Sequence, residues 1–260
     1  MLFHMATLTN ATPLRRWLIV LVLLSSSLFL GHAATAANKP VLTVGLELFP
    51  PLIEENRTGY SVEWLQAVAD EAGMELRIRI MPYSRAKVAL MTEQVDLIGH
   101  TPYKLETDRF YDYAAELDHR VPTKMDAFAL TPGELAFEAG YMELIGTPFG
   151  NSAFIADLTD VSRDRFVEAS LTRIVNMMLA GRVHTVVFER MSVVTQLRHQ
   201  ARQPVYYRLV RQIDAGFAVR KDNDALLKRL NAAAERVDAK KIYKPYINLL
   251  DWPDEGKIEP

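Results

Sequence analysis

The chain has 260 residues, of which 49% are hydrophobic and 24% are charged, and it contains no cysteine. This composition is typical of a globular protein and excludes collagen-like, disordered and coiled-coil chains, while the missing cysteines exclude disulfides, thiolate metal sites and cysteine nucleophiles. The formal net charge is -2 and no block of like charge occurs, so no nucleic-acid-binding surface is expected.

Residues 1–36 have the order of a secretory signal peptide. Their only formal charges are Arg15 and Arg16, an apolar run follows over 17–30, and small residues come next. The alternative is a membrane anchor, but 14 residues are fewer than the ~20 that a spanning helix needs. We therefore expect cleavage, most simply after Ala34-Thr35-Ala36, and a mature chain outside the cytoplasm.

The first half of the mature chain alternates strand-like and helix-like patterns. The predicted elements are a strand over 41–47, a helix over 61–72, a strand over 74–80, a helix from 82 and a strand over 95–99. Strands that alternate with helices at this spacing predict a parallel sheet covered by helices.

A similar pattern follows in the second half. The predicted elements are a strand over 142–146, helices over 151–158 and 170–179, a strand over 185–188, a helix over 191–198, strands over 205–210 and 217–219 and a helix over 224–237. Two α/β units of this size predict two lobes.

Motifs of catalysis and metal binding are missing from the sequence. It contains no G-x-S-x-G, G-x-G-x-x-G or phosphate-binding loop motif. The mature chain has four histidines, and none has metal-ligand spacing to another. We therefore expect no cofactor, no metal site and no catalytic residue.

Polar groups that follow strands are candidates for a binding site, because the carboxyl ends of parallel strands line a ligand crevice. The turn 147–152 precedes a helix whose free amides could hold an anion, and the alternative is an ordinary capped turn between a strand and a helix. Glu189 and Arg190 follow the strand 185–188 and could face a ligand or form a surface ion pair. The same two interpretations apply to residues in the first lobe, namely Arg85, His100, Thr101 and Arg109. Aromatic residues near turns could stack on a ligand or pack in the core, among them Phe49 and Tyr83.

Several segments together resemble the family-3 bacterial extracellular solute-binding proteins, the periplasmic components of polar amino-acid uptake. The matching segments are 44–51, 59–65, 81–86, 95–98, 106–109, 146–152, 179–183 and 216–222. Their order and spacing extend the resemblance over about residues 41–245.

The resemblance implies an α/β fold of the type II periplasmic-binding-protein class, a hinged clamp of two lobes. Each lobe is a mostly parallel sheet flanked by helices. The first lobe is expected from residues 37–127 and 217–260, and the second from 128–216. Two crossing segments, 125–130 and 215–219, would join them.

The resemblance also implies roles for individual residues. Arg109 would grip a ligand carboxylate, the helix start at Asn151 and Ser152 would assist, and Glu189 would take an amino group. The chain departs from the family's pattern at Lys104 and Glu106, and Arg85 is an alternative anion contact. The full set of expected ligand-binding residues is Phe49, Tyr83, Arg85, His100, Thr101, Arg109, Phe149, Asn151, Ser152 and Glu189.

The function expected from the sequence is capture of a small polar solute, zwitterionic or anionic, without chemical change. A monomer would deliver this solute to the membrane permease of an ABC-type importer. One alternative is a periplasmic lyase or dehydratase on the same scaffold, with Glu189 or His100 as acid or base. The other is a receptor domain that reports its ligand to a separate membrane partner.

Overall fold

The computed structural model describes residues 39–138 and 142–260, so the expected signal peptide, residues 1–36, lies outside the described residues. The strands are β1 (Val41–Leu46), β2 (Glu75–Ile80), β3 (Leu97–Pro102), β4 (Ala114–Ala129), β5 (Ile145–Pro148), β6 (Phe166–Ala169), β7 (Thr185–Glu189), β8 (Val205–Arg220) and β9 (Glu255–Ile258). The helices are α2 (Tyr60–Glu71), α3 (Tyr83–Met91), α4 (Asp108–Tyr111), α5 (Ser152–Thr159), α6 (Leu171–Leu179), α7 (Arg190–Gln200), α8 (Asp224–Ala234) and α9 (Ala239–Leu249), with 3₁₀ turns η1 (Pro132–Leu135) and η2 (Arg163–Arg165).

A first lobe forms around β1, which is paired in parallel with β2 on one side and β3 on the other. Its alternate residues Leu42, Val44 and Leu46 are completely buried. Helix α2 packs Trp64 and Leu65 into the same core, because its apolar residues recur at helical spacing on one face. Helix α3 contacts β1 and β3.

A second lobe repeats this arrangement around β5, which is parallel to β6 and to β7. Helices α6 and α7 contact each other and also β7. Ile174, Val175 and Met178 of α6 are completely buried, as helical spacing on one apolar face requires. The mixed α/β architecture with two lobes, expected from the sequence, is therefore present.

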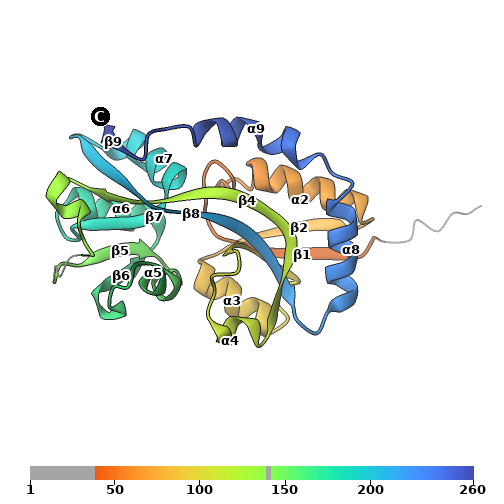
Figure 1. Cartoon of the computed structure of the whole chain (residues 1–260). Helices are drawn as coiled ribbons and strands as arrows, with labels where there is room; N and C mark the ends of the chain where they lie inside the picture. Colours follow the sequence, from red (N-terminus) through yellow and green to blue (C-terminus); the bar gives the residue numbers. More distant parts are fainter. Residues whose placement is uncertain (1–38, 139–141) are drawn as a thin grey trace, which may run out of the picture. The chain divides into compact units, whose positions relative to one another are not determined.

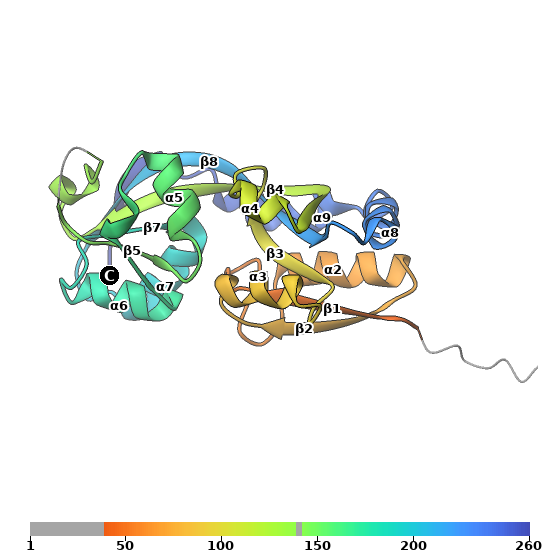
Figure 2. The same ribbon diagram turned by 90° about the horizontal axis from the view of Figure 1, so that it is seen from below.

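Two long antiparallel strands, β4 and β8, connect these lobes (Figure 1). Strand β8 pairs with β3 at one end, and β4 pairs with β7 at its other end. The single sheet thus has the order β2-β1-β3-β8-β4-β7-β5-β6. Figure 2 shows the same two strands extending from the first lobe to the second. The expected crossing segments 125–130 and 215–219 fall largely within them, while the boundaries of the lobes stay a prediction.

The C-terminal segment, residues 239–260, is a third connection between the lobes, besides β4 and β8. Helix α9 packs against α2, where Tyr243 donates to Ser61 Oγ at 3.2 Å. The chain then ends in β9, which pairs with β8 from Val205 to Arg208 (Figure 1). Residues 217–260 were expected in the first lobe, yet β9 lies beside the part of β8 that was expected in the second.

A buried ion pair anchors this segment. Arg190 and Asp126 are both fully buried, and the Arg190 Nε–Asp126 Oδ2 distance is 2.5 Å. The same guanidinium donates to the carbonyls of Trp252 and Pro253, each at 3.0 Å. The start of α7 and the C-terminal part of β4 therefore hold the chain just before β9. Among residues 39–138 and 142–260, no helix is both long and apolar enough to cross a membrane.

Candidate functional site

Two cavities lie between the lobes. The larger, about 460 Å³, is lined by α3 and the β3–α4 segment on one side and by α5, η2 and β6 on the other. Its charged lining residues are Lys87, Glu106, Arg109, Arg163 and Glu168. Because both lobes contribute charged groups, a polar solute in this cavity would be contacted from two sides.

The smaller cavity, about 210 Å³, is mostly apolar. Its walls include Leu48, Met81, Phe149 and Leu171, and its main ionisable group is Glu47. Phe149 was expected at the site and is 38% exposed here. An apolar wall with one carboxyl suits the uncharged part of a solute better than its charged part.

Next to both cavities, the turn before α5 touches the start of α3. The Ser84 amide donates to the Phe149 carbonyl at 3.3 Å, and Lys87 Nζ donates to the Gly150 carbonyl at 3.0 Å. Gly150 has φ +91°, and a Cβ atom placed on it would lie 2.6 Å from the Ser84 nitrogen. Only glycine permits this approach of the two lobes.

Asn151 makes a second connection between the lobes. Its side-chain Nδ2 donates to Glu47 Oε2 at 3.3 Å and to the Pro148 carbonyl at 3.2 Å. Burial raises the pKa of Glu47 to about 8, although the Asn151 amide, the Tyr83 backbone amide and Lys87 partly oppose this. At neutral pH Glu47 therefore favours its uncharged form in this buried position.

The helix start expected to hold a ligand anion already holds one from the protein. Ser152 is the first residue of α5, and its backbone amide donates to Glu168 Oε1 at 3.0 Å. A carboxylate at a helix N-terminus is stabilised by the free amides and the helix dipole. Glu168, from β6, thus occupies the position expected for a ligand carboxylate.

Lys87 and Glu106 form an internal pair in the larger cavity. Lys87 Nζ lies 3.1 Å from Glu106 Oε1, and the Tyr83 hydroxyl donates to the same oxygen at 2.9 Å. Burial and the nearby Glu106 carboxylate raise the pKa of Tyr83 well above its usual value, so the phenol stays a donor. Glu106, a departure from the family's pattern, is therefore used inside the first lobe.

Arg109, which the resemblance suggested as a carboxylate contact, lines the larger cavity. It is exposed, and it forms no ion pair within residues 39–138 and 142–260, so neither Asp108 nor Asp112 is its partner. Arg85, the alternative anion contact, is also exposed but lines neither cavity. The geometry therefore favours Arg109.

Three other expected residues lie in the core of the first lobe. The Phe49 ring packs against His100 at 4.8 Å between centroids, and His100 Nε2 shares a hydrogen bond with Ser61 Oγ at 2.8 Å. Burial lowers the pKa of His100 to about 3, so its ring is neutral. Thr101 donates to Glu116 at 2.9 Å. None of the three lines either cavity.

Glu189 caps its own helix. Its carboxylate accepts from the amides of Met191 and Ser192, from the Ser192 hydroxyl and from the Tyr246 hydroxyl, at 2.7 to 3.2 Å. Burial raises the pKa of Glu189 to about 7, and these donors oppose the shift. The residue is completely buried and lines neither cavity.

The sequence did not single out four residues that the structure brings to the site. Glu47 directly follows β1, and the rule that strand ends face the crevice could have identified it. Lys87 lies one helical turn after Tyr83. Arg163 and Glu168 belong to η2 and β6, for which no element was predicted, so no signal pointed to them.

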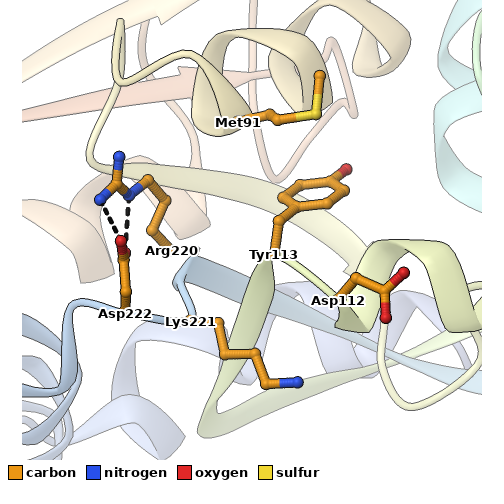
Figure 3. A pocket seen from close by; sticks show the side chains of 6 residues that line it. All are labelled: Met91, Asp112, Tyr113, Arg220, Lys221 and Asp222. Atoms are coloured by element: carbon orange, nitrogen blue, oxygen red, sulfur yellow. Dashed lines mark hydrogen bonds and ion pairs between the residues drawn. The ribbon is translucent and has the colours of Figure 1, made fainter.

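Two other features of residues 39–138 and 142–260 were compared with these cavities, namely potential metal ligands and the pocket around Arg220. No group of three potential metal-binding His, Cys, Asp or Glu side chains occurs in the part of the chain that the structure describes. Figure 3 shows a further pocket, lined by residues that include Arg220, Asp222 and Tyr113. Arg220 pairs there with Asp222 and also with Glu93, so its charge is already compensated.

The sequence matches a known protein family over most of its length. A sequence model described as "Bacterial extracellular solute-binding proteins, family 3" matches residues 42–248. No curated protein sequence matches the chain.

Solved structures share the fold at low sequence identity. A histidine kinase sensor domain with similarity to periplasmic binding proteins is 17% identical, with 86% of this chain and 99% of that chain covered and a TM-score of 0.67. An ancestral arginine-binding protein bound to arginine is 19% identical, with 80% and 99% covered and a TM-score of 0.66. The arginine-, lysine-, histidine-binding protein ArtJ of Geobacillus stearothermophilus is 16% identical, with 85% and 96% covered and a TM-score of 0.65.

Proposed function

Because the chain belongs to family 3 of the bacterial extracellular solute-binding proteins, we propose that it is a periplasmic protein that captures a small polar solute between its lobes. The solute would be amino-acid-like or an organic anion, and a monomer would deliver it to the permease of an ABC-type importer. Residues 1–36 would direct export and then be removed.

The observation that carries this proposal is the larger cavity, whose charged lining comes from both lobes. Arg109 lies on the first lobe, while Arg163 and Glu168 lie on the second. A solute that contacts both lobes stabilises their closed arrangement, because each lobe alone would offer only part of the contacts. The hinge would be formed by β4 and β8, which connect the lobes.

The similar structures support a polar solute. Two of them are proteins described as binding arginine, or arginine, lysine and histidine. The solute of this chain depends on the charged groups that line its own cavity.

We expect binding without chemical conversion. Glu189 and His100, the two residues considered as acid or base, are both buried outside the cavities. Each is also engaged by hydrogen bonds within the protein, Glu189 by four donors and His100 by Ser61. A group that reaches no substrate cannot transfer a proton to it.

A second candidate function is ligand sensing. The similarity to a histidine kinase sensor domain, which covers 86% of this chain, favours it. In that role the closed, ligand-bound form would contact a separate membrane receptor instead of a permease. Both functions require the same capture step, so they differ only in the partner that recognises closure.

A thermal-shift screen of the chain from residue 37 against amino acids and small organic acids tests the capture step. A ligand at about a hundred times its Kd should raise the free energy of unfolding by about 2.7 kcal/mol. Mass spectrometry after long incubation should recover that ligand unchanged. If no small polar solute raises the melting temperature, capture is wrong, and if turnover is detected, the protein is an enzyme.

Uptake of the identified ligand by cells separates transport from sensing. Cells that lack this chain should lose high-affinity uptake if it serves a permease. Normal uptake together with a lost transcriptional response to the ligand would favour the sensing role.

A further inference from the structure

The charged groups of the larger cavity are not equally available to a ligand. Lys87 and Glu106 compensate each other at 3.1 Å. Glu168 is held by the Ser152 amide at the start of α5. Arg109 and Arg163 remain, and neither has an ion-pair partner within residues 39–138 and 142–260. Three cationic side chains (Lys87, Arg109 and Arg163) and two anionic ones (Glu106 and Glu168) line the cavity, so its formal charge is positive.

The guanidinium groups of Arg109 and Arg163 belong to opposite lobes. Arg109 lies in α4 of the first lobe, and Arg163 begins η2 of the second, yet both line one cavity of about 460 Å³. Guanidinium groups bind carboxylates with two parallel hydrogen bonds, and such bonds are strong because both partners are charged. A ligand with one acidic group for each arginine would join the two lobes.

The acidic side chains near the cavity are poorly placed for a cationic ligand. Glu106 already accepts from Lys87 and Tyr83, and Glu168 accepts from the helix start. Glu189, expected to take an amino group, is completely buried and accepts four hydrogen bonds. Of the four carboxylate oxygens of Glu106 and Glu168, only Glu168 Oε2 has no hydrogen bond from residues 39–138 and 142–260. An ammonium or guanidinium group that reached it would also face Arg109 and Arg163.

We infer that the cavity selects a small dianion, such as a dicarboxylate, held between Arg109 and Arg163, and that Glu168 keeps ligand carboxylates away from the helix start. This inference rests on the proposed function, because it names the class of solute that the same cavity captures. It separates this chain from the arginine-binding proteins that share its fold. Arg163 and Glu168 are then residues that determine specificity.

Calorimetry with succinate, glycine and arginine as probes tests the inference on the chain from residue 37. We expect succinate to bind at least about ten times more tightly than glycine or arginine, and its affinity to fall as salt rises, because exposed charges are screened. Arg163→Ala should weaken succinate binding about tenfold or more, and Arg163→Lys should restore part of it, since a point charge cannot reproduce the planar group.

A matched control removes a charge elsewhere on the same lobe. Arg182 follows α6, is exposed and lines neither cavity, so Arg182→Ala should leave succinate affinity unchanged. Glu168→Ala should free the amides of α5 and raise the affinity for glycine about tenfold or more, while circular dichroism and melting temperature show that each variant folds.

These measurements distinguish selection of a dianion from capture of a small solute in general. Tight binding of arginine or glycine that Arg163→Ala does not change would overturn the dianion and leave solute capture intact. If neither succinate nor any other small polar solute binds, the dianion and solute capture are both overturned. Equal effects of Arg163→Ala and Arg182→Ala on succinate would mean that general charge, not this cavity, attracts the anion, and would also overturn the inference.

Discussion

The side-chain amide of Asn151 donates to the Glu47 carboxyl at 3.3 Å, so one hydrogen bond joins the end of β1 to the turn before α5. Glu47 is only 6% exposed and Asn151 only 4%. Because the two residues belong to different lobes, separation of the lobes would return both to water. The protonation state of Glu47 is therefore linked to the closed arrangement.

The first prediction concerns Glu47 and alkaline pH. Its pKa is about 8 in the folded protein against an ordinary value of 4.5, so the folded state retains a proton that the unfolded state has released between these values. This stabilisation is complete below about pH 4.5 and is lost as pH rises towards 8, by at most about 1.4 kcal/mol per pH unit. Glu47→Gln keeps an acceptor for Asn151 and carries no charge, so it should lose less stability over this window.

Urea unfolding at about pH 5.5 and about pH 8.5 measures this difference. A residual slope should remain in the variant, because burial also raises the pKa of Glu189, to about 7. Identical slopes in wild type and Glu47→Gln would contradict the assignment of Glu47 as a buried, protonated carboxyl.

The second prediction concerns acid pH and His119. Its ring stacks on Trp64 at 3.9 Å between centroids, and burial lowers its pKa to about 4. The unfolded chain gains a proton near pH 6.5 that the folded protein cannot accept, so stability falls as pH drops from about 6.5 towards 4. His119→Phe preserves a stacked ring without titration and should make this acid limb less steep while the alkaline limb stays as in wild type. Part of the limb should remain, because burial also lowers the pKa of His100, to about 3. Unfolding curves from about pH 4 to 7 would show it, and an unchanged acid limb would exclude His119 as a cause.

The third prediction concerns the approach of the lobes at Gly150. Gly150→Ala places a methyl group 2.6 Å from the Ser84 nitrogen in a backbone conformation with φ +91°, so the turn must withdraw from α3. We expect a more open average structure in small-angle scattering and weaker ligand binding. Gly181→Ala is the matched control, since Gly181 has φ +68° but nothing within 4 Å of the added Cβ. If both variants bind ligand equally well, contact at Gly150 is not needed for closure.

The fourth prediction concerns the buried pair of Asp126 and Arg190. Asp126→Asn leaves the fully buried Arg190 guanidinium without its counter-charge, which should cost about 3–5 kcal/mol of stability. Glu75→Gln breaks an exposed pair with Arg77 at 3.8 Å and should cost about 1 kcal/mol or less. Hydrogen exchange should also speed up in β9, because Arg190 holds the carbonyls of Trp252 and Pro253. Equal costs for the two variants would show that burial does not strengthen this pair.

Local patterns were sufficient to predict much of the fold. The apolar run at 41–47 and the alternation at 74–80 correspond to β1 and β2, because side chains that are buried or half-buried in a sheet leave a direct trace in the sequence. The full length of β4, from Ala114 to Ala129, was not predicted. Its first part contains charged residues and Pro122, and its pairing partner β8 lies about a hundred residues away, so no local pattern reveals it.

The C-terminal helix shows a second reason why sequence patterns could not predict the whole fold. Helix α9 contains Pro245, which ordinarily argues against a helix interior. Burial of Tyr243, which donates to Ser61 of the first lobe, and of Tyr246, which donates to Glu189 of the second, compensates for this. Only the tertiary structure contains that information. For the same reason, the sequence could predict only part of the site. Arg109 was identified by a motif, whereas the role of Glu168 depends on the pairing of β6 with β5, which brings it to the Ser152 amide.

The last prediction concerns Arg109, because it distinguishes a ligand contact from a surface charge. Arg109 lines the larger cavity and has no ion-pair partner among residues 39–138 and 142–260. Its removal should therefore change the free energy of unfolding by about 1 kcal/mol or less. In the closed complex its bond to an anionic ligand is charge-assisted and shielded from water, so Arg109→Ala should cost about 2–5 kcal/mol of binding, at least about thirtyfold in Kd. Arg109→Lys should recover only part of this loss, because the ammonium cannot form two parallel hydrogen bonds. Calorimetry that finds wild-type affinity in Arg109→Ala would remove Arg109 from the site, and Arg85→Ala would then test the alternative anion contact.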